Sequence, residues 1–157
     1  LELALGNKQL GSSATSLQQL LDQHLADATL SDLLCTDCDT DTPKRCTGEQ
    51  SVVITNPPRV LTLTLKRYTY DERGNTLSHK RAVHLESREL RYGGVTYAVR
   101  AIVVHQGDSP RAGHYYSYVA MDDNWIYCSD MTVRHVQAFD RTQVATNAYV
   151  YLFEMCD

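Results

Sequence analysis

The sequence predicts an α+β fold in which a largely antiparallel sheet is accompanied by few helices. Three observations support this class. Several short segments alternate apolar and polar residues with a period of two, as strands with one buried face do. Most of these segments are separated by only a few turn-forming residues, and such short connections join antiparallel neighbours. Near the N-terminus, a single segment instead shows the apolar spacing of an amphipathic helix.

The N-terminal elements follow directly from these patterns. Residues 1–5 alternate leucine with Glu2 and Ala4, which predicts a short strand, and the small polar residues 6–15 predict a loop. Ser16 can then cap a helix, and Gln19, three residues later, completes a capping box. The apolar stripe of this helix consists of Leu17, Leu20, Leu21 and Leu25.

The middle of the chain contains a loop and several strands. Residues 35–48 are rich in Asp, Thr and Lys and predict a knuckle-like loop. Strands are expected at 51–54 and 60–68, separated by prolines that cannot donate ladder hydrogen bonds. Residues 71–75 predict a turn, and 82–85 are a weaker strand candidate.

The C-terminal half predicts the centre of the sheet. Residues 92–94 form a turn, and the β-branched segment 95–105 should be the longest and most central strand. A loop is expected at 106–113, followed by a hairpin of residues 114–120 and 125–128. Asp140 with Gln143 predicts a second capping box and a short helical turn before a last strand at 148–155.

Composition limits the function classes. The 157 residues are 43% hydrophobic and 22% charged, which fits one ordinary globular domain. A net charge of -4 argues against a nucleic-acid binder, and no apolar run approaches the ~20 residues of a membrane span. The N-terminal leucines read as structure rather than as a signal peptide. The odd count of five cysteines then indicates a reducing compartment, the cytoplasm or the nucleus.

His114 is the main catalytic candidate. It follows Gly113 at the start of a predicted strand, and Ser129 and Asp130 come about fifteen residues later. A general base needs an imidazole and a second group that fixes its tautomer, and either residue could be that group. The residues alone fit equally well a surface histidine at a junction of loop and strand.

A second candidate site is the pair Cys35 and Cys38. Two thiolates three positions apart can ligate one tetrahedral zinc ion, although a structural site normally has four ligands. Cys46 could be a third ligand, and a loop of free thiols is the alternative interpretation.

The order of several motifs resembles the ubiquitin-specific protease family. The resemblance rests on the histidine segment Gly113-His114-Tyr115-Tyr116-Ser117-Tyr118-Val119, on Trp125 and Ser129-Asp130, on residues 147–153, on the segment 58–68 and on Cys35-x-x-Cys38. It implies a papain-like palm with a zinc-knuckle-type finger portion at about residues 30–50. The whole chain, residues 1–157, would be the C-terminal part of one catalytic domain.

The resemblance also implies an activity and residue roles. The protein would be a deubiquitinase, a cysteine-type hydrolase that cleaves the isopeptide bond after the C-terminal glycine of ubiquitin. His114 would be the general base, oriented by Ser129 or Asp130, and Gly113 and Tyr115 would bind the ubiquitin tail. A serine can hold the ring but brings no charge, whereas a carboxylate makes a charge-assisted bond.

The chain departs from the family pattern at the nucleophile. The family cysteine lies in a box close to Asn-x-Gly-x-Thr-Cys, which this sequence lacks, and Cys128 and Cys156 read as packing or incidental thiols. The resemblance therefore implies that a helical thumb segment outside this chain supplies the cysteine, and that this chain alone is inactive. It also implies that Cys35 and Cys38 form half of a structural zinc site whose other pair lies outside the chain.

Three functions follow from these observations. The expected partners of the deubiquitinase are ubiquitin or a ubiquitinated protein and the missing thumb segment. The main alternative is a noncatalytic ubiquitin-binding scaffold or regulator that uses the same surface. A third possibility is a zinc-ribbon interaction domain unrelated to ubiquitin.

Overall fold

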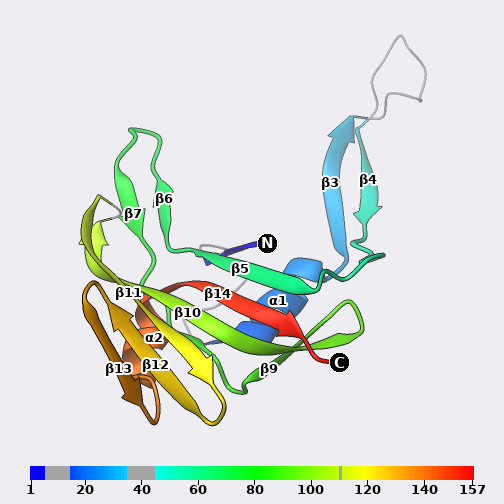
Figure 1. The fold of residues 1–157 in the computed structure, drawn as a ribbon. Helices are drawn as coiled ribbons and strands as arrows, with labels where there is room; N and C mark the ends of the chain where they lie inside the picture. The colour runs from blue at the N-terminus through cyan, green and yellow to red at the C-terminus, as the bar shows by residue number, and fades with distance from the viewer. Residues whose placement is uncertain (6–14, 35–44, 110) are drawn as a thin grey trace.

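A computed structural model describes residues 1–5, 15–34, 45–109 and 111–157, and it has the α+β fold that the sequence predicts. An eight-stranded sheet dominates it (Figure 1). The strand order is β1 (Glu2–Ala4), β5 (Val60–Lys66), β14 (Ala148–Met155), β10 (Val95–Ser109), β11 (Ala112–Met121), β12 (Asn124–Ser129) and β13 (Thr132–Val136), and β9 (Glu89–Tyr92) also pairs with β10. Only the β1–β5 pair of this sheet is parallel.

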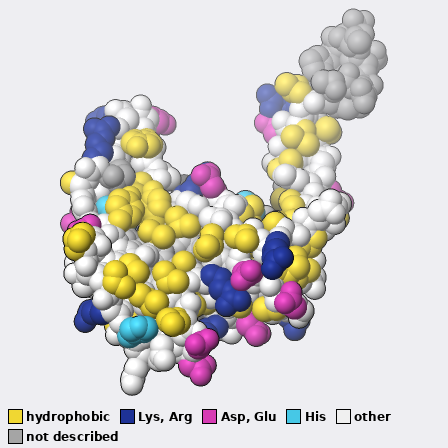
Figure 2. Space-filling view, viewed as in Figure 1, with side chains coloured by type: hydrophobic (Ala, Val, Ile, Leu, Met, Phe, Trp, Pro, Cys, Tyr) yellow, Lys and Arg dark blue, Asp and Glu magenta, His cyan; other side chains and the backbone are white. Residues whose placement is uncertain are grey.

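Three strand pairs lie outside this sheet. They are β2 (Thr15–Ser16) with β8 (Val83–His84), β3 (Ala28–Leu34) with β4 (Arg45–Gln50), and β6 (Tyr68–Tyr70) with β7 (Thr76–Ser78). We call the β3–β4 ribbon the arm and the eight-stranded sheet with its two helices the palm. The β6–β7 hairpin and the arm rise from opposite ends of the palm, and Figure 2 shows the hollow between them.

The core forms where the alternating strands meet helix α1 (Leu17–Leu25). Leu61, Leu63 and Leu65 of β5 are buried, as their alternation predicts. In α1, Leu17, Leu20 and Leu21 are buried and Leu25 packs against the core from a partly exposed position. The predicted capping box is confirmed: the Ser16 side chain accepts from the Gln19 backbone N–H, and the Gln19 side chain accepts from the Ser16 N–H.

The second predicted cap is confirmed only in part. Asp140 caps helix α2 (Arg141–Asn147) and accepts hydrogen bonds from the backbone N–H groups of Thr142 and Gln143. The reciprocal bond of a capping box is replaced, because the Gln143 side chain accepts instead from the Asn147 amide at 3.0 Å. Asp140 therefore begins the helix without help from Gln143.

A buried arginine joins the ends of several elements. Arg67 is 3% exposed, and its guanidinium donates to four backbone carbonyls, those of Ala145, Ala148, His79 and Arg81. Burial lowers the pKa of Arg67 to about 10, so the group stays charged at neutral pH. The dipoles of these carbonyls stabilise its charge. The hydrogen bonds connect the start of β14 to the residues that follow the β6–β7 hairpin.

Two predicted segments around the arm are wrong. Residues 51–54 form no strand and are mostly exposed, whereas residues 45–48, expected in a loop, belong to β4. Strand β3 was not predicted at all. Every residue of β3 is exposed, so its sequence carries no alternation of apolar and polar positions that could reveal it.

Two boundaries within the palm also differ from the prediction. Residues 106–113 were expected to form a loop, but β10 runs to Ser109 and β11 begins at Ala112, with a register shift between Gln106 and Ser109. The segment 60–68 is divided between β5 and β6. The loop expected at 6–15 is wrong at its last residue, because Thr15 belongs to β2. Residues 6–14, residues 35–44 and Pro110 lie outside the described residues. Within the described part of the chain, no helix has the length and apolarity to cross a membrane.

Candidate active site

His114 and Ser129 meet at one end of the β11–β12 hairpin. The hairpin pairs Ser117 with Cys128, which leaves His114 and Ser129 on neighbouring strands near its open end. The His114 Nε2 atom lies 2.6 Å from the Ser129 Oγ atom, a short hydrogen bond. The His114 ring also stacks on Tyr116 at 6.5 Å between centroids, while its side chain remains 44% exposed. The ring is therefore oriented from two sides and still accessible.

Asp130 lies near Nδ1, the other nitrogen of the His114 ring. It occupies the turn between β12 and β13 with a φ of 48°, a left-handed conformation that aspartate tolerates in turns. Its Oδ2 atom is 3.9 Å from His114 Nδ1, too far for a hydrogen bond, and its side chain is 81% exposed. Of the two candidate partners, Ser129 makes the hydrogen bond and Asp130 offers only a nearby charge.

This geometry determines what the ring can do. If Nε2 carries the proton and donates to Ser129 Oγ, then Nδ1 has a free lone pair. A neutral imidazole with one nitrogen anchored and the other free can accept a proton from a nearby acidic group. The arrangement is that of a general base whose proton donor would approach from the Nδ1 side.

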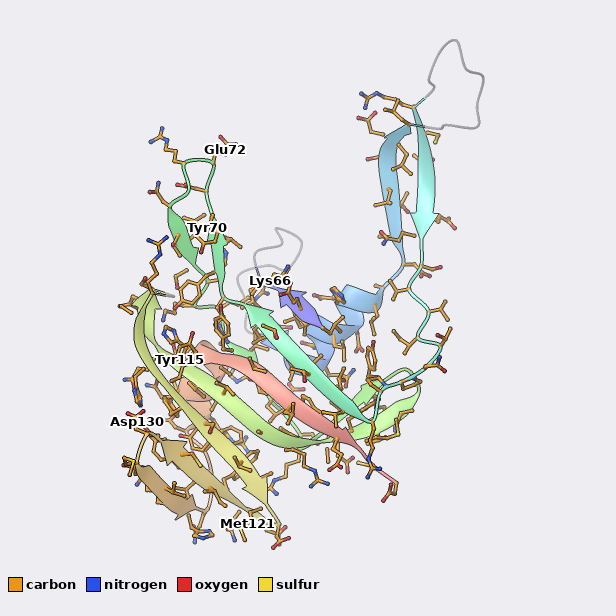
Figure 3. All side chains as sticks on the ribbon, turned by 45° about the horizontal axis from the view of Figure 1, so that its top comes forward. Lys66, Tyr70, Glu72, Tyr115, Met121 and Asp130 are labelled. Atoms are coloured by element: carbon orange, nitrogen blue, oxygen red, sulfur yellow. The ribbon has the colours of Figure 1, made fainter. Side chains whose placement is uncertain are left out.

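Gly113 and Tyr115 flank His114 and face the opposite side of β11. Tyr115 pairs with His105 in register and is half exposed. A Cβ atom at Gly113 would lie 2.4 Å from His105 Nε2 and 2.6 Å from the Gln106 carbonyl oxygen, so only glycine fits. In the view of Figure 3, Tyr115 lies between Tyr70 of the β6–β7 hairpin and Asp130. The predicted residues thus gather at one end of the palm.

Sequence reasoning missed the aromatic cluster beside Tyr115. The rings of Tyr68, Tyr115 and Tyr149 surround His105, with centroid distances of 6.1, 4.4 and 6.5 Å. Burial raises the pKa of both Tyr68 and Tyr149, so these phenols stay neutral. The sequence predicts a central strand at residues 95–105, but nothing in that pattern marks His105, its last residue, as buried among aromatic rings.

The cysteines of the described residues give no second site. Cys46 lies in β4, where its thiol contacts the Leu33 carbonyl at 3.5 Å, and Cys128 lies half-buried in β12 between Ser117 and Val133. Cys156 is exposed. Among the residues that the structure describes, no group of three potential metal ligands comes together. Cys35 and Cys38 lie outside these residues, so zinc binding stays a prediction.

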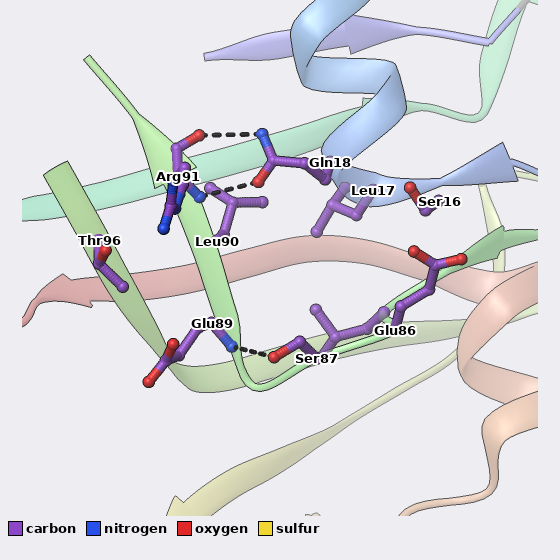
Figure 4. A pocket seen from close by; sticks show the side chains of 10 residues that line it. Ser16, Leu17, Gln18, Glu86, Ser87, Glu89, Leu90, Arg91 and Thr96 are labelled. Atoms are coloured by element: carbon purple, nitrogen blue, oxygen red, sulfur yellow. Dashed lines mark hydrogen bonds between the residues drawn. The ribbon is translucent and has the colours of Figure 1, made fainter. Parts of the chain in front are cut away.

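A hollow of about 320 Å³ lies elsewhere, between the start of α1 and strand β9 (Figure 4). Gln18 closes one side of it through two hydrogen bonds to the Arg91 backbone, and Ser87 Oγ accepts from the Glu89 N–H. None of the candidate site residues lines this hollow. The candidate catalytic site is therefore separate from this hollow, and the His114 side chain is 44% exposed to solvent.

Comparisons with known proteins show the family of this chain. A family model described as "Ubiquitin carboxyl-terminal hydrolase" matches residues 7–153. Ubiquitin carboxyl-terminal hydrolase 4 of Arabidopsis thaliana is 31% identical over 97 residues, which are 57% of this chain and 27% of that protein. Ubiquitin carboxyl-terminal hydrolase 10 of Rattus norvegicus is 30% identical over 129 residues, which are 72% of this chain and 16% of that protein.

Solved structures show the same fold. A chain of the yeast SAGA DUBm superposes with a TM-score of 0.69 at 19% identity and covers 99% of this chain. A chain of the SAGA DUB module bound to monoubiquitin gives 0.67 at 20% identity, again over 99% of this chain. The match takes up 35% of each of those chains, so the present chain spans about a third of these structures and about a quarter or less of the two curated relatives.

Proposed function

The chain belongs to the ubiquitin carboxyl-terminal hydrolase family, and from this premise we propose that it is the C-terminal part of a cysteine-type deubiquitinase. The protein would cleave the isopeptide bond after the C-terminal glycine of ubiquitin. The observation that carries the proposal is the 2.6 Å hydrogen bond between His114 Nε2 and Ser129 Oγ; when Nε2 is its donor, Nδ1 is free as a proton acceptor. The likeness to a solved module bound to monoubiquitin supports ubiquitin as the partner.

The first chemical step uses His114 as a base. Its Nδ1 atom takes the proton of a cysteine thiol, and the resulting thiolate attacks the carbonyl carbon of the terminal glycine. The tetrahedral intermediate collapses when the imidazolium returns this proton to the leaving lysine amine. A thioester and a free amine result.

The second step regenerates the enzyme. His114 Nδ1 removes a proton from water, the hydroxide attacks the thioester, and the cysteine leaves as a thiolate that regains the proton. In both steps the ring must keep Nδ1 directed at the reacting atoms. Ser129 serves this by accepting the Nε2 hydrogen throughout.

Asp130 would have a weaker role in the same cycle. Its carboxylate lies 3.9 Å from Nδ1 and is largely exposed, so water screens its attraction to the imidazolium. The serine hydroxyl carries no charge but makes the direct bond. We therefore assign orientation to Ser129 and a minor electrostatic contribution to Asp130.

The nucleophile would come from a segment outside this chain. None of the five cysteines lies in a box close to Asn-x-Gly-x-Thr-Cys, and Cys128 pairs within the sheet. We propose that a thumb segment of the same catalytic domain brings the cysteine to Nδ1. On this proposal, the present chain alone does not hydrolyse ubiquitin conjugates.

Gly113 and Tyr115 would contact the ubiquitin tail. Gly113 lacks a side chain where the backbone lies close to His105, and Tyr115 presents a half-exposed ring beside it. A slender tail of two glycines could lie against such a surface, next to the reacting nitrogen. The hollow beside the β6–β7 hairpin would hold the body of ubiquitin (Figure 2).

We further propose that Cys35 and Cys38 hold half of a structural zinc site. In the sequence, Cys35 directly follows β3, and both cysteines come before β4. Two thiolates at this spacing fit half of a tetrahedral site, and a second pair from outside the chain would complete it. The ion would supply structural stability there and take no part in the reaction.

The absence of a nucleophile box favours one alternative, a noncatalytic ubiquitin-binding scaffold. A ubiquitin probe with a thiol-reactive C-terminal group distinguishes the two when it is added to the intact protein. Covalent labelling supports the hydrolase. Ubiquitin binding without labelling supports the scaffold, and the absence of both contradicts the two proposals together.

Variants at the site test the residue roles. His114→Ala should lower turnover by about 10²–10⁴-fold while the affinity for ubiquitin stays nearly unchanged, because the ring touches the reaction rather than the body of ubiquitin. Ser129→Ala should cost more turnover than Asp130→Ala. The reverse order would give the orienting role to Asp130, and full turnover in His114→Ala would remove His114 from the mechanism.

A further inference from the structure

His105 is the only buried histidine among the described residues, at 3% exposure. It lies in β10, one register position from the pair Gln106–His114, and its own partner in β11 is Tyr115. Partners opposite each other in a ladder point to the same face of the sheet. The His105 ring therefore lies on the face of Tyr115, and His114 lies on the other.

The His105 ring supports the backbone on both sides of the β10–β11 connection. Ideal Cβ atoms built on Gly113 and Gly107 would lie 2.4 and 3.1 Å from the ring, at Nε2 and Cε1. At Gly113 the distance to His105 leaves no room for a side chain. At Gly107 the contact with His105 is tight, and the Ala112 carbonyl oxygen at 2.6 Å leaves no room for a side chain. The two glycine positions thus rest against one imidazole, and Gly113 directly precedes His114.

Hydrogen bonds hold this ring and give it a direction. Tyr68 Oη lies 3.2 Å from His105 Nδ1 and 3.3 Å from the Gly107 carbonyl oxygen. Because the phenol has only one proton, both contacts are made together only when His105 Nδ1 donates to Tyr68 and Tyr68 donates to Gly107. Lys80 Nζ donates to the same carbonyl at 2.7 Å and also contacts Asn147 Oδ1 at 3.3 Å. One carbonyl next to the site is therefore fixed from two directions.

The His105 imidazole also packs against the Tyr115 ring. The two ring centroids are 4.4 Å apart, and Tyr149 meets His105 edge-on at 6.5 Å. Tyr149 also meets Tyr115 nearly at right angles. Tyr115, though half exposed, thus has one side held by a buried ring.

We propose that His105 is a positioning residue that sets the Gly107 and Gly113 backbone and the Tyr115 ring, and with them the surface that receives the ubiquitin tail. The claim that this surface receives the ubiquitin tail rests on the proposed function, whereas the claim that His105 supports the backbone does not. His105 acts through the residues it touches and meets no reacting atom.

A role for His105 as a second base is excluded by its surroundings. The ring is buried, it faces away from His114, and Nε2 is covered by Gly113. Burial lowers the pKa of His105, and the positive charge of Lys80 lowers it further, so the ring is neutral at physiological pH. It is a support that carries no charge.

The first test needs no substrate. Amide hydrogen exchange is measured on the intact protein, its His105→Ala variant and its His105→Phe variant. We expect exchange at Gly113, His114 and Tyr115 to rise at least about tenfold in His105→Ala and to rise less in His105→Phe, which keeps an aromatic ring. Unchanged protection in His105→Ala, with the variant folded, would overturn the proposal.

The second test concerns the tail. The affinity of each variant is measured for ubiquitin and for ubiquitin that lacks its last two residues. In the wild-type protein the truncation should weaken binding by about tenfold or more, and in His105→Ala this difference should shrink toward none while the affinity for truncated ubiquitin is kept. An undiminished difference in His105→Ala would overturn the role at the tail.

The two tests separate the inference from the proposed function. If the wild-type protein binds neither form of ubiquitin, the proposed function fails, and hydrogen exchange still decides whether His105 supports its neighbours. Tyr68→Phe provides a matched control, because it removes the two hydrogen bonds but keeps the rings packed. It should give an intermediate effect in both tests; an effect as large as that of His105→Ala would assign the support to the hydrogen bonds rather than to the ring.

Discussion

Strands β3 and β5 are both seven residues long, yet they lie in opposite environments. In β5, which pairs with β1 and β14, Leu61, Leu63 and Leu65 are buried in the core. In β3, every residue is exposed, and among the described residues its strand partner is β4 alone. The comparison shows that hydrogen-bond pairing alone makes a strand but does not make a core.

The difference has an energetic meaning. The palm is stabilised by apolar burial, at about 25 cal/mol per Å² removed from water. The arm has a much smaller contribution of this kind, because Leu30, Leu33 and Leu34 remain 38–60% exposed. A lone two-stranded ribbon is marginally stable at best in water. The arm must therefore depend on something beyond its own side chains, and the zinc proposed at Cys35 and Cys38 is one such contribution.

The largest expected difference between the palm and the arm comes from replacing one leucine by alanine in each region. Leu63→Ala removes a fully buried side chain from the palm and should lower the free energy of unfolding by about 2–5 kcal/mol. Leu34→Ala in the arm should change it by less than about 0.5 kcal/mol. Chemical denaturation of the intact protein measures both. Equal losses would show that the arm is buried in the intact protein.

A second pair of variants compares two arginines. Arg67→Met in the palm leaves buried carbonyls of Ala145 and Ala148 without donors and should cost roughly 3 kcal/mol. In the arm, Arg45 pairs with Asp32 on the surface, so Arg45→Met should cost between zero and about 1 kcal/mol. A small loss for Arg67→Met would mean that water replaces the guanidinium.

Lowering the pH should reduce the stability of the palm through the protonation of His105. Burial and the charge of Lys80 hold its pKa below the ordinary value of 6.5, so the unfolded chain binds a proton more readily than the folded one. Stability should therefore be complete above pH 6.5 and fall as the pH drops below it. The difference in unfolding free energy between the wild type and His105→Phe, measured from pH 8 to about 5, isolates this contribution. A difference that does not change with pH would mean that His105 titrates normally.

Metal removal should have the smallest effect on the palm and a local effect on the arm. A zinc chelator added to the intact protein should speed proteolytic cleavage near residues 28–50 and leave the unfolding midpoint of the palm unchanged. Replacing Cys35 and Cys38 by serine should give the same pattern without chelator. If neither treatment changes cleavage, the zinc proposal is wrong.

The same contrast explains how much of the fold could be predicted. Strand β5 was predicted closely because its period-two alternation records which face is buried. Strand β14 has the predicted bounds, although its mostly apolar sequence does not alternate in this way. The arm was missed because residues that face water on both sides carry no such record. The continuation of β10 and β11 toward each other was missed because Gly107, Asp108 and Ser109 look like a loop, although Ser109 pairs with Ala112 beyond a register shift.

The candidate site was predictable in part. The spacing from His114 to Ser129 and Asp130 pointed to a histidine and its partner, but the choice between them depended on a turn. Asp130 adopts a left-handed conformation at that turn, which carries its carboxylate to the Nδ1 side and leaves Ser129 at Nε2. His105 could not be identified because its role comes from contacts across strands.

The Gln18 amide affects whether copies of this molecule can associate through the edge of β9. Strand β9 pairs with β10 on one side only, and its other side would present unpaired peptide groups. Gln18 fills both positions at Arg91, donating to its carbonyl at 3.0 Å and accepting from its N–H at 2.8 Å, as a neighbouring strand would. A helix side chain thus occupies a free sheet edge that could otherwise recruit a second chain into an aggregate.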